Sequence, residues 1–357
     1  MRHATTERVR TAWITPRATR GCVTLGGAVL GMMLVGCGEE AVRQTPASDT
    51  EEIRLADDMV MADDGYRLPI HHWPARGQPQ AVVLGLHGFN EHGGTFEMLA
   101  EALTPRDITL YAHDQRGFGA TAERGIWPGH ERLADDVTLL AEWLAERHPE
   151  TPRYLVGHSM GGAVALLALG GDTPPPVAGS VLISPAVWGV ETMPWYQRLS
   201  LWVGVHLFPA LRLPSSMTET LGIEPTDDPE VARRLSEDPL ILHQARVDTL
   251  NGMSLAMSAG LDAARRLPAP ALILYGTQDE IIPPEAICDL LERLPDDEAI
   301  RLVIYPQGYH MLTRYSERRR TEADIAAWLT DPAAPLPSGH EVDHREARQT
   351  LCAPLSR

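Results

Sequence analysis

The sequence predicts an α/β protein built on a mostly parallel β-sheet, and three patterns in the chain indicate this fold class. Short apolar runs that suit buried strands alternate with segments of helical spacing. Strands that alternate with helices form right-handed βαβ units, which produce parallel sheets. Residues 190–268 interrupt this alternation with helical pieces that prolines break. We therefore expect helices on both faces of a sheet and an inserted helical cap over it.

The expected strands differ in how much of their surface is buried. Residues 59–61 and 67–73 alternate apolar with polar side chains around a turn at 63–65, as antiparallel strands do. Residues 81–87 are continuously apolar, as in a parallel strand that is covered on both faces. Further strands are expected at 108–113, 154–157, 177–183, 271–275 and 300–305.

Helices are expected between these strands, because apolar residues recur there at intervals of three and four. In the segment 133–145, for example, Leu133, Val137, Leu140 and Leu144 fall on one face. Other helices are expected at 95–103, at 161–169, around 284–294 and at 321–329.

The first residues have the composition of an export signal. Five arginines and one glutamate precede an apolar run at 21–36, which is shorter than the about 20 residues of a membrane-spanning helix. The run ends in Leu34-Val35-Gly36-Cys37, which resembles a bacterial lipobox. This resemblance implies that Cys37 is lipidated and anchors an exported protein to the cell envelope, at the outer membrane or the periplasmic face. An uncleaved short membrane anchor is the alternative.

The predicted organisation has six parts. Residues 38–55 are polar and acidic, which suits a flexible tether, and residues 331–357 are rich in proline and charge, which suits a flexible tail. The parts are a signal peptide at 1–36, the tether at 37–55, a core at 56–189, the cap at 190–268, the rest of the core at 269–330 and the tail at 331–357.

The charge balance excludes some functions. The 357 residues carry a formal net charge of −17, and all 31 basic residues are arginine. Nucleic-acid binding is not expected, because recognition of phosphates needs basic patches. The lack of lysine also excludes Schiff-base chemistry and a phosphate-binding loop built around a lysine.

A serine motif lies between a predicted strand and a predicted helix. Gly157-His158-Ser159-Met160-Gly161 fits the pattern G-x-S-x-G, which is weak alone but stands here in the required strand–turn–helix context. The turn is sharp and needs small neighbours, which Gly157 and Gly161 provide. Ser159 is therefore the candidate nucleophile. A glycine-rich turn that only packs strand on helix is the alternative.

A serine hydroxyl needs a base that removes its proton, and the base needs an orienting carboxylate. With this motif, the chain order is serine, then acid, then histidine. His310 follows the last strand of the core and Asp279 follows the preceding one, so both lie at strand ends. Glu280 competes with Asp279 for the carboxylate role, and a capping or surface histidine is the alternative for His310.

Acyl transfer passes through an oxyanion that two backbone N–H groups must stabilise. The amide of Met160, just after the serine, is one candidate. The second should come from the loop after residues 81–87, where the amide of Phe89 is the best candidate. His87 and Gly88 are then expected to shape this loop, and His87 is not expected to act as a base.

Taken in order, these motifs resemble the monoacylglycerol lipase and lysophospholipase branch of the α/β-hydrolases, which is similar to serine aminopeptidases of the S33 type. The resemblance rests on HGFNEHGGTFEMLA from His87, DQRGFGAT from Asp114, GHSMGG from Gly157, SEDPL from Ser236, YGTQDEIIPPE from Tyr275 and YPQGYHML from Tyr305. The Glu91-His92 pair and the DPL of the cap are the features most specific to this branch. The resemblance implies an eight-stranded sheet, a helical cap, and ester hydrolysis that needs no metal or other cofactor.

The function that these observations favour is a serine carboxylic-ester hydrolase acting on monoacylglycerols, lysophospholipids or related acyl esters through an acyl-enzyme. Its partners would be a small lipid substrate and, through Cys37, a membrane. Other chemistry on the same fold, such as a serine peptidase, is the alternative among enzymes. A non-catalytic, membrane-tethered binding protein is the alternative outside enzymes. The sequence does not indicate an oligomeric state.

Two histidine patterns resemble metal-binding sequences, but neither is expected to bind a metal. His340-Glu341-Val342-Asp343-His344 matches the zinc-protease pattern H-E-x-x-H, but it lies in the polar tail, where neither a buried helix nor a third ligand is expected. His71 and His72 are adjacent in a strand, so they point to opposite faces and cannot share a metal.

Cysteines and cap aromatics leave alternatives open. Cys288 is expected to be a buried free thiol, although export would allow it to pair with Cys352. The aromatic residues of the cap, among them Trp195 and Trp202, either line an acyl-chain pocket or form only a hydrophobic core.

Overall fold

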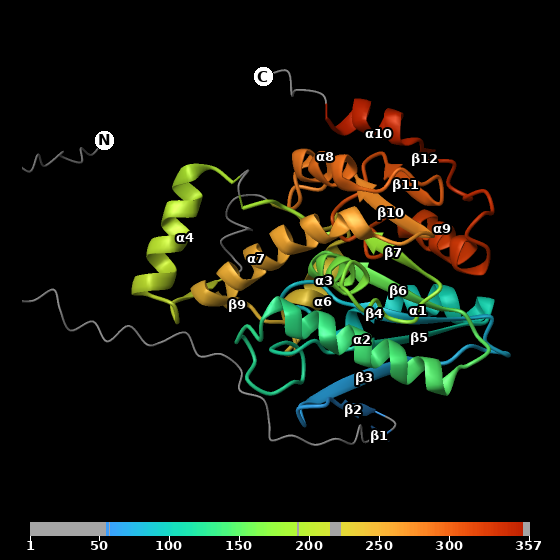
Figure 1. Ribbon diagram of the computed structural model, residues 1–357, viewed down its shortest axis with the longest axis horizontal. Helices are drawn as coiled ribbons and strands as arrows, with labels where there is room; N and C mark the ends of the chain where they lie inside the picture. Colours follow the sequence, from blue (N-terminus) through green and yellow to red (C-terminus); the bar gives the residue numbers. More distant parts are fainter. Residues whose placement is uncertain (1–54, 57, 191–192, 215–222, 353–357) are drawn as a thin grey trace, which may run out of the picture. The chain divides into compact units, whose positions relative to one another are not determined.

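The computed structural model describes residues 55–56, 58–190, 193–214 and 223–352, which are built around a ten-stranded β-sheet (Figure 1). Six parallel strands form the middle of this sheet. In order across it they are β5 (Ile108–His113), β4 (Ala81–Leu86), β6 (Arg153–His158), β7 (Gly179–Ile183), β10 (Ala271–Gly276) and β11 (Ile300–Tyr305). The expected mostly parallel sheet is therefore confirmed. The signal peptide, Cys37 and the tether up to residue 54 lie outside the described residues.

Antiparallel strands extend the sheet at both edges. At one edge lie β1 (Leu55–Ala56), β2 (Met59–Met61) and β3 (Arg67–Trp73), and β3 pairs with β5. At the other edge β12 (Glu341–Val342) pairs with β11. The eight expected strands are all present, and the sheet has ten strands rather than eight because the short β1 and β12 join its edges.

Helices cover both faces of the sheet. One face packs against α2 (His130–Arg147), α3 (Met160–Leu169), α8 (Pro284–Arg293) and α10 (His344–Leu351). The other packs against α1 (Glu97–Leu103) and α9 (Arg318–Thr330). Short 3-10 turns are η1 (Gly93–Phe96), η2 (Thr104–Arg106) and η3 (Ala264–Arg266). Two faces covered by helices explain why every residue of β4, β5, β7 and β10 is buried.

The segment expected to be a cap contains both cap elements and part of the core. It holds α4 (Trp195–Leu207), α6 (Pro229–Glu237), α7 (Val247–Ala263) and a small sheet of β8 (Arg212–Pro214) with β9 (Gln244–Arg246). In Figure 1, α7 extends from α4 towards the core helix α3, and it contacts both. Gly260 of α7 allows this approach, because a Cβ there would lie 2.9 Å from the Ala163 carbonyl oxygen of α3. The structure therefore places α7 in the helical layer, inside the range expected for the cap.

The C-terminal segment differs from the expected flexible tail. It folds back as β12 and α10, and Ala347 and Leu351 of α10 are buried against α8. A disulfide between Cys288 of α8 and Cys352 fixes this contact. The expectation that Cys288 is a free thiol is therefore wrong, and the open possibility of pairing is the one that the structure shows.

Candidate active site

Ser159 lies at a strained turn between β6 and α3. Its backbone angles are φ 53° and ψ −118°, in a region that residues other than glycine rarely adopt. Its N–H donates to the Ile183 carbonyl of β7 at 3.0 Å, which fixes the turn to the neighbouring strand. The turn places the serine at the N-terminus of α3, at the edge where the parallel strands end.

The two glycines of the motif are required by close backbone contacts. A Cβ at Gly161 would lie 1.9 Å from the Leu86 carbonyl oxygen, and a Cβ at Gly157 would lie 2.5 Å from the Gly161 carbonyl oxygen. Any side chain at either position would force the turn apart.

Asp279 and His310 are brought together by the loops that follow β10 and β11. Nδ1 of His310 lies 2.8 Å from Oδ2 of Asp279, and both side chains are buried. The other carboxylate oxygen of Asp279 accepts from the Ile281 and Ile282 N–H groups, each at 2.9 Å. Glu280, the competing carboxylate, instead accepts from the Glu224 N–H at 3.3 Å and is exposed. The geometry therefore selects Asp279 as the partner of His310.

The turn at Ser159 contacts the His310 loop through His158. The rings of His158 and His310 have centroids 5.1 Å apart, and Nε2 of His158 donates to the His310 carbonyl at 3.3 Å. Within the described residues no hydrogen bond joins the Ser159 hydroxyl to His310. Catalytic hydrogen bonds are often long without substrate and form only in the reacting complex.

The loop after β4 presents a backbone amide with no protein partner. Across the described ranges, neither the Phe89 N–H nor the Met160 N–H donates to another residue. Met160 is the first residue of α3, where the helix dipole favours a negative charge. The two amides expected to stabilise an oxyanion are thus both available.

His87 supports this loop as a neutral side chain. The Gln115 N–H donates to its Nε2 at 2.9 Å, so Nδ1 carries the proton and donates to the Gly88 carbonyl at 2.8 Å. Burial lowers the pKa of His87 to about 4. His87 therefore joins Gly88 to Gln115 through both ring nitrogens, and its role in shaping the loop stays a prediction. A Cβ at Gly88 would lie 2.9 Å from Oε2 of Glu91, so a side chain there would displace the Glu91 carboxylate.

A buried ion pair beside these loops was not predicted from the sequence. Nη2 of Arg314 lies 2.6 Å from Oε1 of Glu91, and both residues are buried. The sequence singled out Glu91 without a role. No sequence pattern marks Arg314, because its partner is 223 residues away in the chain.

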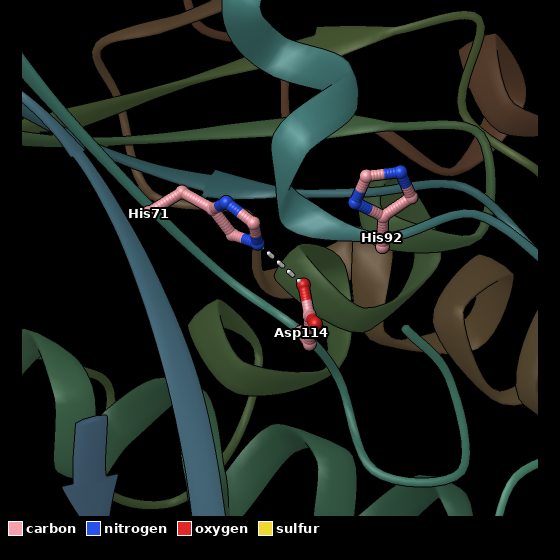
Figure 2. Close-up of side chains that lie close together, drawn as sticks. All are labelled: His71, His92 and Asp114. Atoms are coloured by element: carbon pink, nitrogen blue, oxygen red, sulfur yellow. Dashed lines mark hydrogen bonds and ion pairs between the residues drawn. The ribbon is translucent and has the colours of Figure 1, made fainter. Parts of the chain in front are cut away.

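A second polar cluster consists of His71, His92 and Asp114 (Figure 2). One possible ligand atom from each residue lies within 4.8 Å of the others, as a metal site requires. However, Oδ1 of Asp114 accepts from Nε2 of His71 and from the Gly93 N–H, each at 2.8 Å, and Oδ2 accepts from the Ala120 N–H at 2.7 Å. Oδ1 of Asp114 thus accepts two hydrogen bonds and Oδ2 accepts one, so hydrogen bonds alone account for how the three side chains lie against the loop after β4.

The remaining partner of this cluster comes from the cap. Nδ1 of His92 accepts from the Gly94 N–H at 3.1 Å, so Nε2 carries the proton and donates to Oδ2 of Asp238 at 2.9 Å. Asp238 belongs to the DPL sequence of the cap, and the Leu242 N–H donates to the Asn90 carbonyl nearby. The branch-specific residues His92 and Asp238 therefore join the cap to the loop after β4.

The H-E-x-x-H pattern does not lie on one helix. Glu341 and Val342 form β12, whereas His344 begins α10 and its Nε2 donates to the Ile300 carbonyl at 3.2 Å. His340 and His344 are therefore not placed on one helical face, which the zinc-protease geometry requires.

The fold and site define a class of hydrolases. A mostly parallel sheet, a serine on a strained strand-to-helix turn, and an acid–histidine pair on later loops are features of the α/β-hydrolase fold. Residues 77–317 match the family described as "Serine aminopeptidase, S33". The chain therefore belongs to this family of α/β-hydrolases.

Two proteins that are similar to this chain carry names that match the monoacylglycerol lipase resemblance of the sequence. The chain is 31% identical to the monoglyceride lipase of Homo sapiens over 286 residues, which cover 77% of this chain and 88% of the relative. It is 27% identical to the monoacylglycerol lipase of Mycolicibacterium smegmatis, with 74% of this chain and 93% of the relative covered.

Solved structures agree on the fold. The crystal structure of the Paleococcus ferrophilus monoacylglycerol lipase is similar with a TM-score of 0.60 and 27% identity, and the match covers 74% of this chain and 99% of that one. A soluble variant of the Saccharomyces cerevisiae monoglyceride lipase has a TM-score of 0.65 at 20% identity, with coverage of 82% and 100%. The α/β-hydrolase fold is thus confirmed.

Proposed function

We propose that the protein is a serine carboxylic-ester hydrolase that cleaves monoacylglycerols, lysophospholipids or related acyl esters. The hydrogen bond between Asp279 and His310 carries the proposal, because it lies at the same sheet edge as Ser159 and the amides of Phe89 and Met160, which have no acceptor among the described residues. A nucleophile, an oriented base and two oxyanion donors are the parts that acyl transfer needs.

The proposed reaction has two steps. His310 takes the proton of Ser159 as the serine oxygen attacks the ester carbonyl, and the Phe89 and Met160 amides stabilise the oxyanion. His310 then gives its proton to the departing alcohol, which leaves an acyl-enzyme. A water molecule, deprotonated by His310, hydrolyses the acyl-enzyme and restores the serine. Asp279 keeps the imidazole in the required tautomer throughout.

The outward face of α4 supports a lipid substrate delivered from a membrane surface. Trp195, Leu199 and Trp202 recur at the spacing of one helical face, yet they are 73%, 51% and 60% exposed. In a chain with a net charge of −17, residues 193–214 contain two arginines and no acidic residue. Aromatic side chains beside cationic ones suit the boundary of an anionic bilayer. Across the ranges that the structure describes, no helix is long and apolar enough to span a membrane.

We further propose that lipidated Cys37 anchors the exported chain to the cell envelope. The basic and apolar leader that ends in a lipobox-like sequence supports this, and the Cys288–Cys352 disulfide agrees with it, because disulfides persist in oxidising compartments. Labelling cells with a clickable fatty acid tests the anchor. Cys37→Ser should abolish the label, and an unchanged label would contradict lipidation.

The activity is tested on p-nitrophenyl esters of short to long acyl chains, on monoacylglycerol and on lysophosphatidylcholine. We expect hydrolysis of the longer chains and of monoacylglycerol, and we expect Ser159→Ala to lose both turnover and labelling by a fluorophosphonate probe. Hydrolysis that persists in Ser159→Ala would contradict the serine mechanism.

A serine peptidase is the second candidate, because the matched family is described as serine aminopeptidase. Aminoacyl p-nitroanilides distinguish the two functions. Cleavage of these amides without cleavage of acyl esters would replace the esterase proposal.

A further inference from the structure

We propose that Glu91 is a positioning residue that holds the oxyanion loop, residues 88–91, against the loops that carry Ser159 and His310. The inference rests on the proposed function, because it concerns how the Phe89 amide is presented to the oxyanion. Glu91 itself is not expected to touch the substrate or to transfer a proton.

The Glu91 side chain closes the oxyanion loop on itself. The Glu91 N–H donates to the Gly88 carbonyl at 3.2 Å, and the Gly88 N–H donates back to Oε2 of Glu91 at 3.1 Å. Phe89 and Asn90 lie inside this closed turn, and Asn90 has a φ of 65°. Since both ends of the turn are fixed, the direction of the Phe89 N–H depends on the Glu91 carboxylate.

The same carboxylate fixes the loop to the segment after His310. Oε1 of Glu91 lies 2.6 Å from Nη2 of Arg314, four positions beyond His310. Charge-assisted hydrogen bonds of this length are among the stronger contacts in a protein. This contact therefore couples the position of the oxyanion loop to that of the segment after His310.

A third contact reaches the serine turn. Nε2 of His158 donates to the His310 carbonyl, so Nδ1 of the neutral ring is an acceptor. Nδ1 accepts from Nη2 of Arg314 at 3.4 Å, and Oε2 of Glu91 lies 3.4 Å from the same nitrogen. His158 immediately precedes Ser159. The Glu91–Arg314 ion pair thus contacts all three segments whose relative placement the reaction needs.

The cost of burying this carboxylate argues for a role in placement. Glu91 is 6% exposed and Arg314 5%. Burial opposes ionisation of Glu91, but the guanidinium of Arg314 outweighs it and holds the pKa of the carboxyl well below its usual range. A buried ion pair is often no more stabilising than an apolar pair of the same shape. Stability alone therefore does not account for this pair.

The experiment compares Glu91→Gln with the double variant Glu91→Leu/Arg314→Met in the full chain. In Glu91→Gln an amide replaces one carboxylate oxygen, so one of the two N–H donors loses its acceptor. We expect kcat to fall about 10- to 100-fold, part of the effect of losing an oxyanion donor, with KM changed less than about twofold. The double variant leaves no unpaired charge, so Tm should recover while kcat stays low.

Glu341→Gln is the matched control. It makes the same chemical change in an ion pair of similar length, 2.6 Å to Nη2 of Arg301, between β11 and β12. Its kcat should equal that of the wild type.

Each outcome has a distinct meaning. A wild-type kcat in Glu91→Gln, or a kcat that recovers together with Tm in the double variant, overturns the positioning role and leaves the proposed function standing. If Glu91→Gln does not fold, the double variant decides alone. A wild type that neither hydrolyses esters nor labels at Ser159 overturns the proposed function, and this inference with it.

Discussion

The contact between Asp279 and His310 fixes which ring nitrogen of the proposed base carries a proton. Oδ2 of Asp279 accepts from Nδ1 at 2.8 Å, which leaves Nε2 free to take the serine proton. Asp279→Asn should lower kcat by about 10⁴-fold, because the amide favours the wrong tautomer. Steady-state kinetics on a p-nitrophenyl ester measure the change.

The neighbouring carboxylate provides the control for this prediction. Glu280→Gln removes the same charge one position along the chain, but Glu280 is exposed and bonds to the Glu224 N–H. Its kcat should remain close to that of the wild type. The reverse result, with Glu280→Gln inactive and Asp279→Asn active, would exchange the two roles.

Single residues also show how far the sequence could predict the site. Ser159, Asp279 and His310 could be chosen because each follows a strand in a fixed chain order, and such positions meet at one sheet edge. The structure places Asp279 against His310, while the roles of the three residues remain predictions. Arg314 could not be chosen, since one arginine among 31 basic residues has no local pattern that marks its distant partner.

At the scale of elements, the exposed face of α4 predicts how the protein handles dispersed and membrane-borne substrate. Trp195→Glu/Trp202→Glu should lower turnover of monoacylglycerol in anionic vesicles about tenfold or more, because each change removes an apolar contact and adds a repelled charge. Turnover of a soluble short-chain ester should not change. Vesicle and solution assays on one preparation give the comparison.

Gln197→Glu/Ser200→Glu is the control for charge. Both residues are exposed on α4, and the pair adds the same two charges without removing an aromatic side chain. Equal losses in the two double variants would attribute the effect to charge, and no loss in either would remove the support that α4 gives to a lipid substrate.

The disulfide between α8 and α10 predicts a stability effect without a catalytic one. Its closed loop spans a sequence separation of 64, for which constraint of the unfolded chain contributes about 2–4 kcal/mol. Cys288→Ser/Cys352→Ser should therefore lower Tm by several degrees while kcat at 25 °C stays unchanged. Calorimetry with and without a reductant checks this, and a wild-type Tm that a reductant does not alter would contradict it.

Elements differed in how well the sequence predicted them. Buried parallel strands were predicted closely, because continuous apolar runs between helical segments have few other interpretations. The C-terminal α10 was not predicted, because most of its residues are polar. Its two buried residues, Ala347 and Leu351, make an apolar pattern too short to indicate a buried helix. Contacts with α8 and β11, together with the disulfide, give this segment a fixed place.

At the scale of the whole molecule, two buried neutral histidines predict a loss of stability in mild acid. Burial lowers the pKa of His87 to about 4 and that of His113 to about 3. Both values lie below the usual 6.5 of the unfolded chain, so the unfolded state binds more protons as pH falls below 6.5. The free energy of unfolding should fall from about pH 6.5 to about pH 4, by on the order of 3 kcal/mol for His87.

His113→Met tests this account, because neither ring nitrogen of His113 has a hydrogen-bond partner among the described residues. The variant should show a shallower fall of Tm between pH 6.5 and 4 than the wild type. His206→Gln, at an exposed position of α4, should leave the slope unchanged. A slope that His113→Met does not reduce would assign the acid sensitivity to other groups.

The disulfide also determines what a single cut in the chain would do. His310 lies between Cys288 and Cys352 in sequence, whereas Ser159 and Asp279 precede both. A protease that nicked the irregular stretch at 331–340 would leave Ser159, Asp279 and His310 on one polypeptide and α10 on the other, and the disulfide would keep the two covalently joined. Such a nicked molecule would migrate as one species on a gel until a reductant separated its parts.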